Sequence, residues 1–492
     1  MSRHLINALL VCSAFATSAA SAVALNPRGL GDVLIYPYYT VNAGQDTLFS
    51  LVNTTDTAKV ARVRFLEGYN GRAVFATYVF LSAHDVWTAA ISQVADDDGA
   101  KIATADASCT FPAMPTHAAP FTSDDYTGSN ADGGPTSITR TREGSIEVIE
   151  AGDIQPGGAA EAAITHVQSG LPGGGVPPCT FATGADTQPI DLGDLVAPTG
   201  GLYGSASIVD VAVGTLFAYD ATALTGFSDL VTVDDLTDDA QPSLDQAHSS
   251  ESPATARAYL PVEGIGTIAL DFANGVDAVS AVLMSRSIAN EFLTDPALGA
   301  NTDWVLTFPT KRFYVDDNRY PRAPADPFVE AFHAPGLSSN TLGFDAYDRE
   351  EFEADRISCD GCGPAPSINP FGYGVNVFGF IDDGVAGTPS GVLGSRLSWF
   401  YITRGGTPRG DSGWTTMDLF FGDGGHILPG GSLSTGDPVL LVGLPIVGFM
   451  VYNVVNANAQ PGVLGNYGGA FAHRSTLACS DIIALPCPDA NQ

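Results

Sequence analysis

The stretch DVLIYPYYTVNAGQDTLFSLVN, residues 32–53, decides the fold class of this chain. It contains two runs rich in β-branched and aromatic residues, at positions 32–41 and 46–53, which are separated by a short segment with Asn and Gly. Short runs of this kind, bounded by Gly, Asn and Asp, are typical of strands joined by turns. The stretch therefore predicts two neighbouring strands of a sheet.

The same pattern continues along the chain. Residues 60–65 read VARVRF, so two arginines lie on one face of a strand and the apolar side chains on the other. A GYNG turn at residues 68–71 precedes further strand-like runs at 73–81 and 86–91. Short strands separated by turn signals predict a mainly β fold, with antiparallel, immunoglobulin-like β-sandwich domains, long irregular loops and one or two short helices.

The strand pattern breaks between residues 96 and 201, where Gly, Ala, Pro and Asp cluster. One strand-like stretch, GSIEVIE at residues 144–150, interrupts this composition. We interpret residues 96–201 as an elaborated insertion within a first β-sandwich domain that spans residues 25–320.

The second half contains fewer but clear signals. Residues 276–293 have apolar side chains near helical spacing, and residues 303–316 resemble a long strand or strand pair.

Residues 321–492 form a second β-rich region, which we expect to pack on the first. Its apolar peak at residues 439–455 is rich in valine and contains Pro and Gly, which favours buried strands over a membrane helix. Trp87 and Trp304 lie in strand-like runs and are expected in the core.

The N-terminus has the features of a secretory signal peptide. Arg3 and His4 precede a short apolar run, and small residues follow up to Ala24. The predicted signal peptide covers residues 1–24, with a mature chain beginning near Val23 or Leu25. We therefore expect export to the cell surface or the medium, with the periplasm as the alternative.

The net negative charge of the chain argues against several classes of binding partner. The chain of 492 residues has 54 acidic and 21 basic residues, a net charge of −33, and lysine only at Lys59, Lys101 and Lys311. Nucleic-acid binding needs a basic stripe, which the chain lacks, and an anionic membrane surface is disfavoured for the same reason. No transmembrane segment is expected in the mature chain. The acidity fits a solvated exterior surface or calcium binding.

Six cysteines remain once Cys12 is removed with the signal peptide. An even number in an exported chain predicts disulfides, although six cysteines allow fifteen pairings. Grouping along the sequence favours the pairs Cys109–Cys179, Cys359–Cys362 and Cys479–Cys487.

Four turns rich in Asp and Gly place carboxylate oxygens in loops, as calcium binding requires. None matches the twelve-residue EF-hand loop, and turns favour Asp and Gly for backbone reasons alone. The candidate calcium ligands are Asp96, Asp97, Asp98, Asp316, Asp317, Asp382, Asp383 and Asp423.

Several phrases occur together in this chain, among them GDVLIYPYY at residues 31–39, VRFLEG at 63–68, FPTKRFY at 308–314 and NYGG at 466–469. They resemble a family of exported proteins of Gram-negative bacteria that are described as hypothetical or surface proteins. The resemblance implies an exported, β-rich protein and transfers no activity or catalytic residues.

No catalytic set is recognisable in the sequence, so no catalytic residue is assigned. The leading hypothesis is an exported cell-surface or extracellular protein with a structural or adhesive, non-enzymatic role. Its partners would be the cell surface, the surrounding matrix or other copies of the chain. The alternatives are a calcium-dependent extracellular enzyme acting on polysaccharide, which needs paired carboxylates across a cleft, and a small-ligand-binding protein.

Overall fold

The fold comes from a computed structural model, which describes residues 21–479 except 96, 115–117, 168–174, 181–187, 250–254, 263–265, 351–370, 382–388, 403–411, 421–424, 434 and 461. Two large sheets form the first part of the chain. The eight-stranded sheet contains, in spatial order, β1 (Ala24–Leu25), β14 (Thr222–Thr225), β2 (Val33–Thr40), β10 (Glu143–Ile154), β4 (Lys59–Glu67), β5 (Ala73–Leu81) and β8 (Cys109–Phe111), with β11 (Leu195–Val196) paired to β10. The six-stranded sheet contains β13 (Thr215–Asp220), β12 (Leu202–Asp210), β3 (Asp46–Asn53), β6 (Val86–Gln93), β7 (Ala100–Ala103) and β9 (Ala119–Pro120).

Four smaller sheets follow in the second part. The first contains β15 (Ala256–Val262), β16 (Gly266–Phe272), β24 (Ile427–Ser432), β25 (Pro438–Val442) and β30 (Ala478–Cys479). The second contains β20 (Gly343–Asp348), β23 (Ser412–Asp418), β18 (Ser287–Leu293) and β29 (Arg474–Thr476). The third contains β22 (Ser398–Ile402), β21 (Val375–Ile381), β19 (Ala300–Thr307), β27 (Val447–Gln460) and β28 (Val463–Ala472), and β17 (Met284–Ser285) pairs with β26 (Leu444–Pro445).

Helices are few and short in the described part. The α-helices are α1 (Ala159–Ile164), α2 (Gly275–Leu283) and α3 (Arg312–Val315). The 3-10 helices are η1 (Asn42–Gly44), η2 (Asp124–Tyr126), η3 (Gly128–Asn130), η4 (Ile138–Arg142), η5 (Leu192–Asp194) and η6 (Leu244–Gln246). None of these helices is long and apolar enough to cross a membrane.

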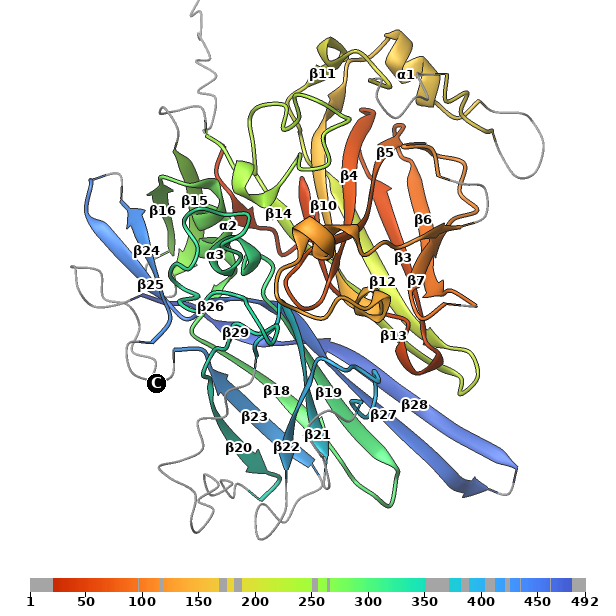
Figure 1. Cartoon of the computed structure of the whole chain (residues 1–492), viewed down its shortest axis with the longest axis vertical. Helices are drawn as coiled ribbons and strands as arrows, with labels where there is room; N and C mark the ends of the chain where they lie inside the picture. Colours follow the sequence, from red (N-terminus) through yellow and green to blue (C-terminus); the bar gives the residue numbers. More distant parts are fainter. Residues whose placement is uncertain are drawn as a thin grey trace, which may run out of the picture.

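The two large sheets pack face to face, as the red to yellow strands of Figure 1 show. The ring of Phe49 from the six-stranded sheet lies 5.8 Å from that of Tyr36 and 5.6 Å from that of Phe65, both from the eight-stranded sheet. Trp87 is fully buried in this core. Paired strands run antiparallel throughout the described part, apart from β21 and β22. The mainly β, sandwich-type prediction is confirmed.

Strand β2 is buried on both faces because it lies inside the larger sheet. Its proline is tolerated at Pro37 because the register with β10 shifts there, with Tyr36 opposite Ile146 but Tyr39 opposite Gly144. A proline at such a bulge removes no ladder hydrogen bond.

Strand β10 occupies a central position that the composition of its surroundings does not suggest. Its twelve residues are all buried, and it pairs with β2 on one side and β4 on the other. The strand-like stretch at residues 144–150 is therefore part of the sandwich framework, although it lies inside residues 96–201, the predicted insertion.

Two predictions in the second half are wrong in extent. The helix expected over residues 276–293 ends at Leu283, and the following residues form β17 and β18. The strand expected over residues 303–316 ends at Thr307, two residues before Pro309, and α3 follows. The strands expected over residues 439–455 are confirmed as β25, β26 and much of β27, and Trp304 is fully buried.

Candidate functional site

A cluster of charged side chains lies buried between β4 and β10. Lys59 is the first residue of β4 and lies directly opposite Asp153 of β10. A bulge at Ala151 shifts the register, so that Glu150 lies opposite Ala61 while Gly152 lies opposite Val60. Residues three apart on a regular strand point to opposite faces, but this extra residue brings Glu150 and Asp153 to the same face as Lys59.

The three side chains are in direct contact. Lys59 Nζ lies 2.8 Å from Glu150 Oε1, 2.5 Å from Asp153 Oδ1 and 3.0 Å from Thr199 Oγ1. The exposed fractions of the Lys59, Glu150 and Asp153 side chains are 0%, 0% and 3%. Thr199 Oγ1 donates to Asp153 Oδ2 at 2.6 Å, and the Gly200 amide donates to Glu150 Oε2 at 3.0 Å. Every partner in the cluster is therefore held in place by the backbone or by another side chain.

The two carboxyl groups differ in their protonation. Burial raises the pKa of Glu150 well above its ordinary value, and the adjacent Asp153 carboxylate adds to this effect. Burial alone would also raise the pKa of Asp153, but hydrogen bonds with Glu150, Lys59 and Thr199 hold that pKa below its ordinary value. Of the two carboxyl groups, Glu150 therefore binds a proton more readily, and Asp153 more readily stays ionised beside Lys59.

A cleft of about 850 Å³ lies on the other face of the eight-stranded sheet and is lined by several arginines and carboxylates. Each guanidinium has an acidic partner. Arg72 Nε contacts Asp316 Oδ2 at 2.7 Å, and Arg319 pairs with Asp125. Arg64 and Arg312 share the carboxylate of Glu147 at 3.1 and 2.7 Å. The cleft lining includes Phe75 and Tyr320 but, within the described residues, no tryptophan.

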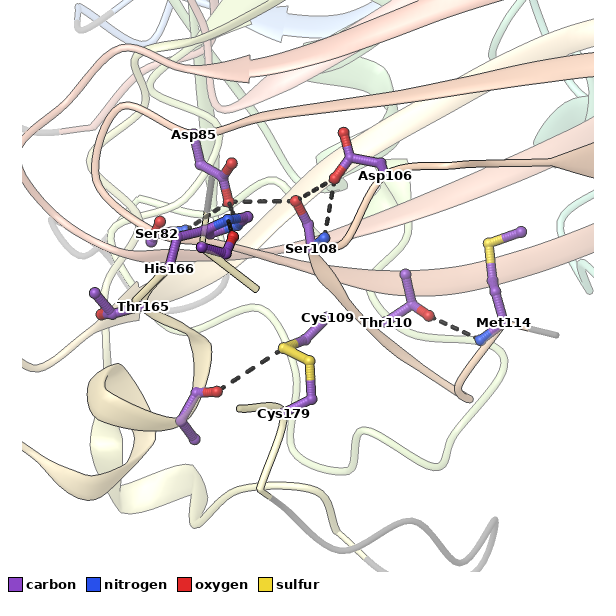
Figure 2. Close-up of a disulfide and its surroundings, with 12 residues drawn as sticks. Ser82, Asp85, Asp106, Ser108, Cys109, Thr110, Met114, Thr165, His166 and Cys179 are labelled. Carbon is purple, nitrogen blue, oxygen red and sulfur yellow. Dashed lines mark hydrogen bonds and ion pairs between the residues drawn. A yellow bond between two sulfur atoms is a disulfide. The ribbon is translucent and has the colours of Figure 1, made fainter. Parts of the chain in front are cut away.

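The disulfide Cys109–Cys179 joins β8 to the segment after α1, which confirms that predicted pair. In the surroundings of this bond, Figure 2 shows the Asp85 carboxylate joined by dashed lines to Ser108 and to His166. Asp85 Oδ2 lies 3.2 Å from His166 Nε2 and 3.4 Å from Ser108 Oγ, and Ser108 Oγ also donates to Asp106 at 2.7 Å. The serine hydroxyl is therefore held by carboxylates and not by the histidine, which an acyl-transfer triad requires as its base.

The calcium candidates that the structure describes do not gather into one site. Asp97, Asp98 and Asp317 are exposed, whereas Asp316 is buried and occupied by Arg72 and Asn70. Four calcium candidates lie outside the described residues, namely Asp96, Asp382, Asp383 and Asp423. The same is true of the predicted disulfide cysteines Cys359, Cys362 and Cys487, of which Cys487 is the partner proposed for Cys479. Across the described part of the chain, no group of three or more His, Cys, Asp or Glu side chains is placed to hold a metal ion.

The outward face of the six-stranded sheet is almost free of charge. Its strands largely alternate between buried and outward residues, and charged residues occur only near strand ends, at Asp46, Lys101, Asp210 and Asp220. A groove of about 460 Å³ runs over it. We refer to it as the outer face, formed by Leu48, Ser50, Val52, Val86, Thr88, Ala90, Ser92, Ala103, Tyr203, Ser205, Ser207, Val209, Leu216 and Ala218.

The fold and these sites define a mainly β, sandwich-type protein with buried ion pairs and a disulfide. No protein-family model, curated protein or solved structure matches the chain.

The sequence analysis did not identify the Lys59 cluster. The signal was present, because the alternation that buries Ala61, Val63 and Phe65 places Lys59 on the same face.

Proposed function

We propose that this chain is an exported cell-surface or extracellular protein with a structural or adhesive role, and that it acts through contacts of the outer face with a second copy of itself. The observation that supports this proposal is the uncharged outer face. Exposed sheet faces are normally polar, whereas this face exposes the large apolar side chains of Leu48, Val86 and Leu216, and exposed apolar patches mark interaction surfaces. In a chain with a net charge of −33, two copies repel each other least where neither carries charge.

The test is the association state of the purified full chain. Sedimentation at rising protein concentration should show dimers or larger assemblies. Replacing Ser50 and Thr88 together by glutamate should abolish them, because this places like charges in the centre of the contact. Ser129→Glu adds a charge at an exposed serine of η3, outside the six-stranded sheet, and should leave association unchanged. A wild-type chain that stays monomeric at every concentration contradicts the proposed contact.

Export is tested by locating the mature protein in fractionated cells. The Cys109–Cys179 disulfide supports export because such bonds persist outside the cytoplasm. Val23 is buried, its amide donates to the Arg257 carbonyl, and its carbonyl accepts from the Tyr259 amide, both at 2.8 Å. Removing residues 1–24 would take Val23 out of the core, so we expect cleavage before Val23. N-terminal sequencing that finds Leu25 first would contradict this boundary.

A second candidate function is the binding of a small polar ligand in the cleft that Arg64, Arg72, Arg312 and Arg319 line. Its size suits a small molecule, and paired arginines and carboxylates supply both donors and acceptors. Thermal-shift screening against organic acids and sugars tests it, and Arg319→Gln should remove any shift, because Arg319 is the most exposed of these four arginines. The polysaccharide-acting enzyme stays an alternative, which hydrolysis of any polymer in an activity screen would favour.

A further inference from the structure

The contact between Lys59 and Asp153 is unusual because a lysine, an aspartate and a glutamate side chain meet in one buried site. Lys59 Nζ and Asp153 Oδ1 are 2.5 Å apart, on directly opposed positions of adjacent strands. The Glu150 carboxyl touches the same Nζ atom at 2.8 Å. From this geometry we propose that the chain joins Lys59 to Asp153 through an amide (isopeptide) bond, with Glu150 as the catalytic proton carrier.

The surroundings favour the amide over the ion pair. Burying an ion pair costs the desolvation free energy of both charges. The attraction between the two charges often does not compensate for that cost. An amide between the same atoms is neutral and needs no such compensation. The fold also holds the amine and the carboxyl in contact before any reaction, which removes the entropic cost of bringing them together.

The reaction balances without any other reactant. Lys59 first passes one proton to the Asp153 carboxylate, which leaves a neutral amine beside a carboxylic acid. The lone pair of Nζ then attacks Cγ of Asp153, a nitrogen–carbon bond forms, and the carbonyl electrons move to oxygen. When the adduct collapses, the carbon–oxygen bond breaks and water leaves. The ammonium and the carboxylate thus become an amide and one water molecule, with no oxidation or reduction.

Glu150 is positioned to carry the protons of the last two steps. Its Oε1 atom contacts Nζ, so it can take the amine proton while it gives its own proton to the departing hydroxyl. Burial raises the pKa of Glu150 well above its ordinary value, which favours the protonated form that this role requires. Thr199 Oγ1 contacts both Nζ, at 3.0 Å, and Asp153 Oδ2, at 2.6 Å, and therefore fixes the two reacting groups relative to each other.

Lys311 provides an internal control. It is also buried, but its Nζ atom contacts the backbone carbonyls of Ser338, Phe371 and Tyr373, which cannot accept the amine in this reaction. The proposal therefore predicts modification of one buried lysine and not of the other. It does not depend on export or on self-association.

The experiment is peptide mass spectrometry of the reduced, fully denatured wild-type chain. An amide at Lys59 blocks tryptic cleavage after this residue, so the peptide of residues 29–62 should appear joined to that of residues 143–257, with the mass of one water missing. Lys311 should be cleaved normally. Separate, unmodified peptides ending at Lys59 would overturn the proposal, and so would linkage of Lys59 to Glu150.

Variants then assign the roles. Asp153→Ala removes the acceptor and Lys59→Met removes the amine, so each should give only unlinked peptides. Glu150→Gln keeps the side-chain shape but cannot exchange protons, and we expect a loss of at least tenfold in the linked fraction with an unchanged circular dichroism spectrum. Glu150→Asp should restore part of the linkage. Full linkage in the folded Glu150→Gln variant would contradict the role of Glu150.

Discussion

The regions around Lys59 and Lys311 bury the same side chain in two different ways. Lys59 lies between two carboxyl groups on the paired strands β4 and β10. Lys311 lies at the start of α3, with three backbone carbonyls around its Nζ atom and the rings of Phe308 and Phe328 at 5.7 and 5.6 Å from that atom. The first site contains a charged partner that can react, and the second offers only dipoles and aromatic faces. Burial alone therefore does not decide the chemistry of a lysine; its acceptors do.

The comparison also separates two structural roles. The Lys59 contact joins strands that are 94 residues apart in sequence. The Lys311 contacts tie one short helix to the irregular segments around Ser338 and Phe371, with burial lowering the lysine pKa well below its ordinary value. We expect the first site to contribute more to the stability of the fold than the second.

The largest effect is expected for Lys59→Met. It removes the Nζ atom that the buried Glu150 and Asp153 side chains contact, and with it the proposed amide between β4 and β10. Breaking a buried pair from one side costs about 3–5 kcal/mol of unfolding free energy. Denaturant unfolding measures this loss, with Lys101→Met as the matched control. Lys101 lies on β7 and is half-buried, so its substitution should cost less than about 0.5 kcal/mol. Equal losses for the two variants would refute the distinction.

A pH-dependent effect of similar size is expected from Asp32, a third buried carboxyl group, which interacts electrostatically with Lys59. Burial raises the pKa of Asp32 from 3.8 to about 6. Between these values the folded state binds more protons than the unfolded state, so stability falls as pH rises through this window. The difference corresponds to about 3 kcal/mol.

The variant Asp32→Asn should remove this pH dependence and make the protein more stable than wild type above pH 6. Unfolding curves between pH 4 and pH 7 test the prediction. The Phe227 amide, which donates to Asp32 Oδ2 at 2.8 Å, keeps an acceptor in the variant. Parallel pH profiles for the two proteins would show that Asp32 does not titrate in this range.

A smaller effect is expected for Lys311→Met. Methionine fills the space between Phe308 and Phe328, but the three carbonyl groups lose a donor, which costs about 1–3 kcal/mol. Since the pKa of Lys311 is lowered by folding, unfolding takes up a proton, and wild-type stability should rise with pH toward the ordinary lysine value of 10.5. The variant should lose this rise. A loss as large as that of Lys59→Met would remove the contrast between the two regions.

Local sequence patterns predicted many strands of the sandwich, but they placed the ends of two elements in the second half wrongly. The runs that became β2, β3, β4, β5 and β6 were recognisable because their alternation is a property of adjacent residues. The helix predicted over residues 276–293 was extended too far because Ala289 and Phe292 lie three apart, which continues the helical spacing past Leu283. Pairing of β18 with β23 and β29 makes these two residues part of a strand instead.

The functional residues also divide into those that the sequence predicted and those that depend on the tertiary structure. The pair Cys109–Cys179 was predictable from cysteine grouping, and the structure confirms it. The calcium candidates rested on turn composition, and the described aspartates among them do not gather into a metal site. The charge-free outer face could not be predicted, because it requires knowing which strands are neighbours and which faces point outward.

The sequence by itself determined the mainly β class, because strand alternation and turn chemistry act over a few residues. It also determined the acidic charge and the pattern of an export signal. Only the tertiary structure decided that Lys59, Glu150 and Asp153 meet, because the bulge at Ala151 and the pairing of β4 with β10 set which side chains share a face. A one-residue change in register would send these groups to opposite sides of the sheet, and no local pattern encodes that choice.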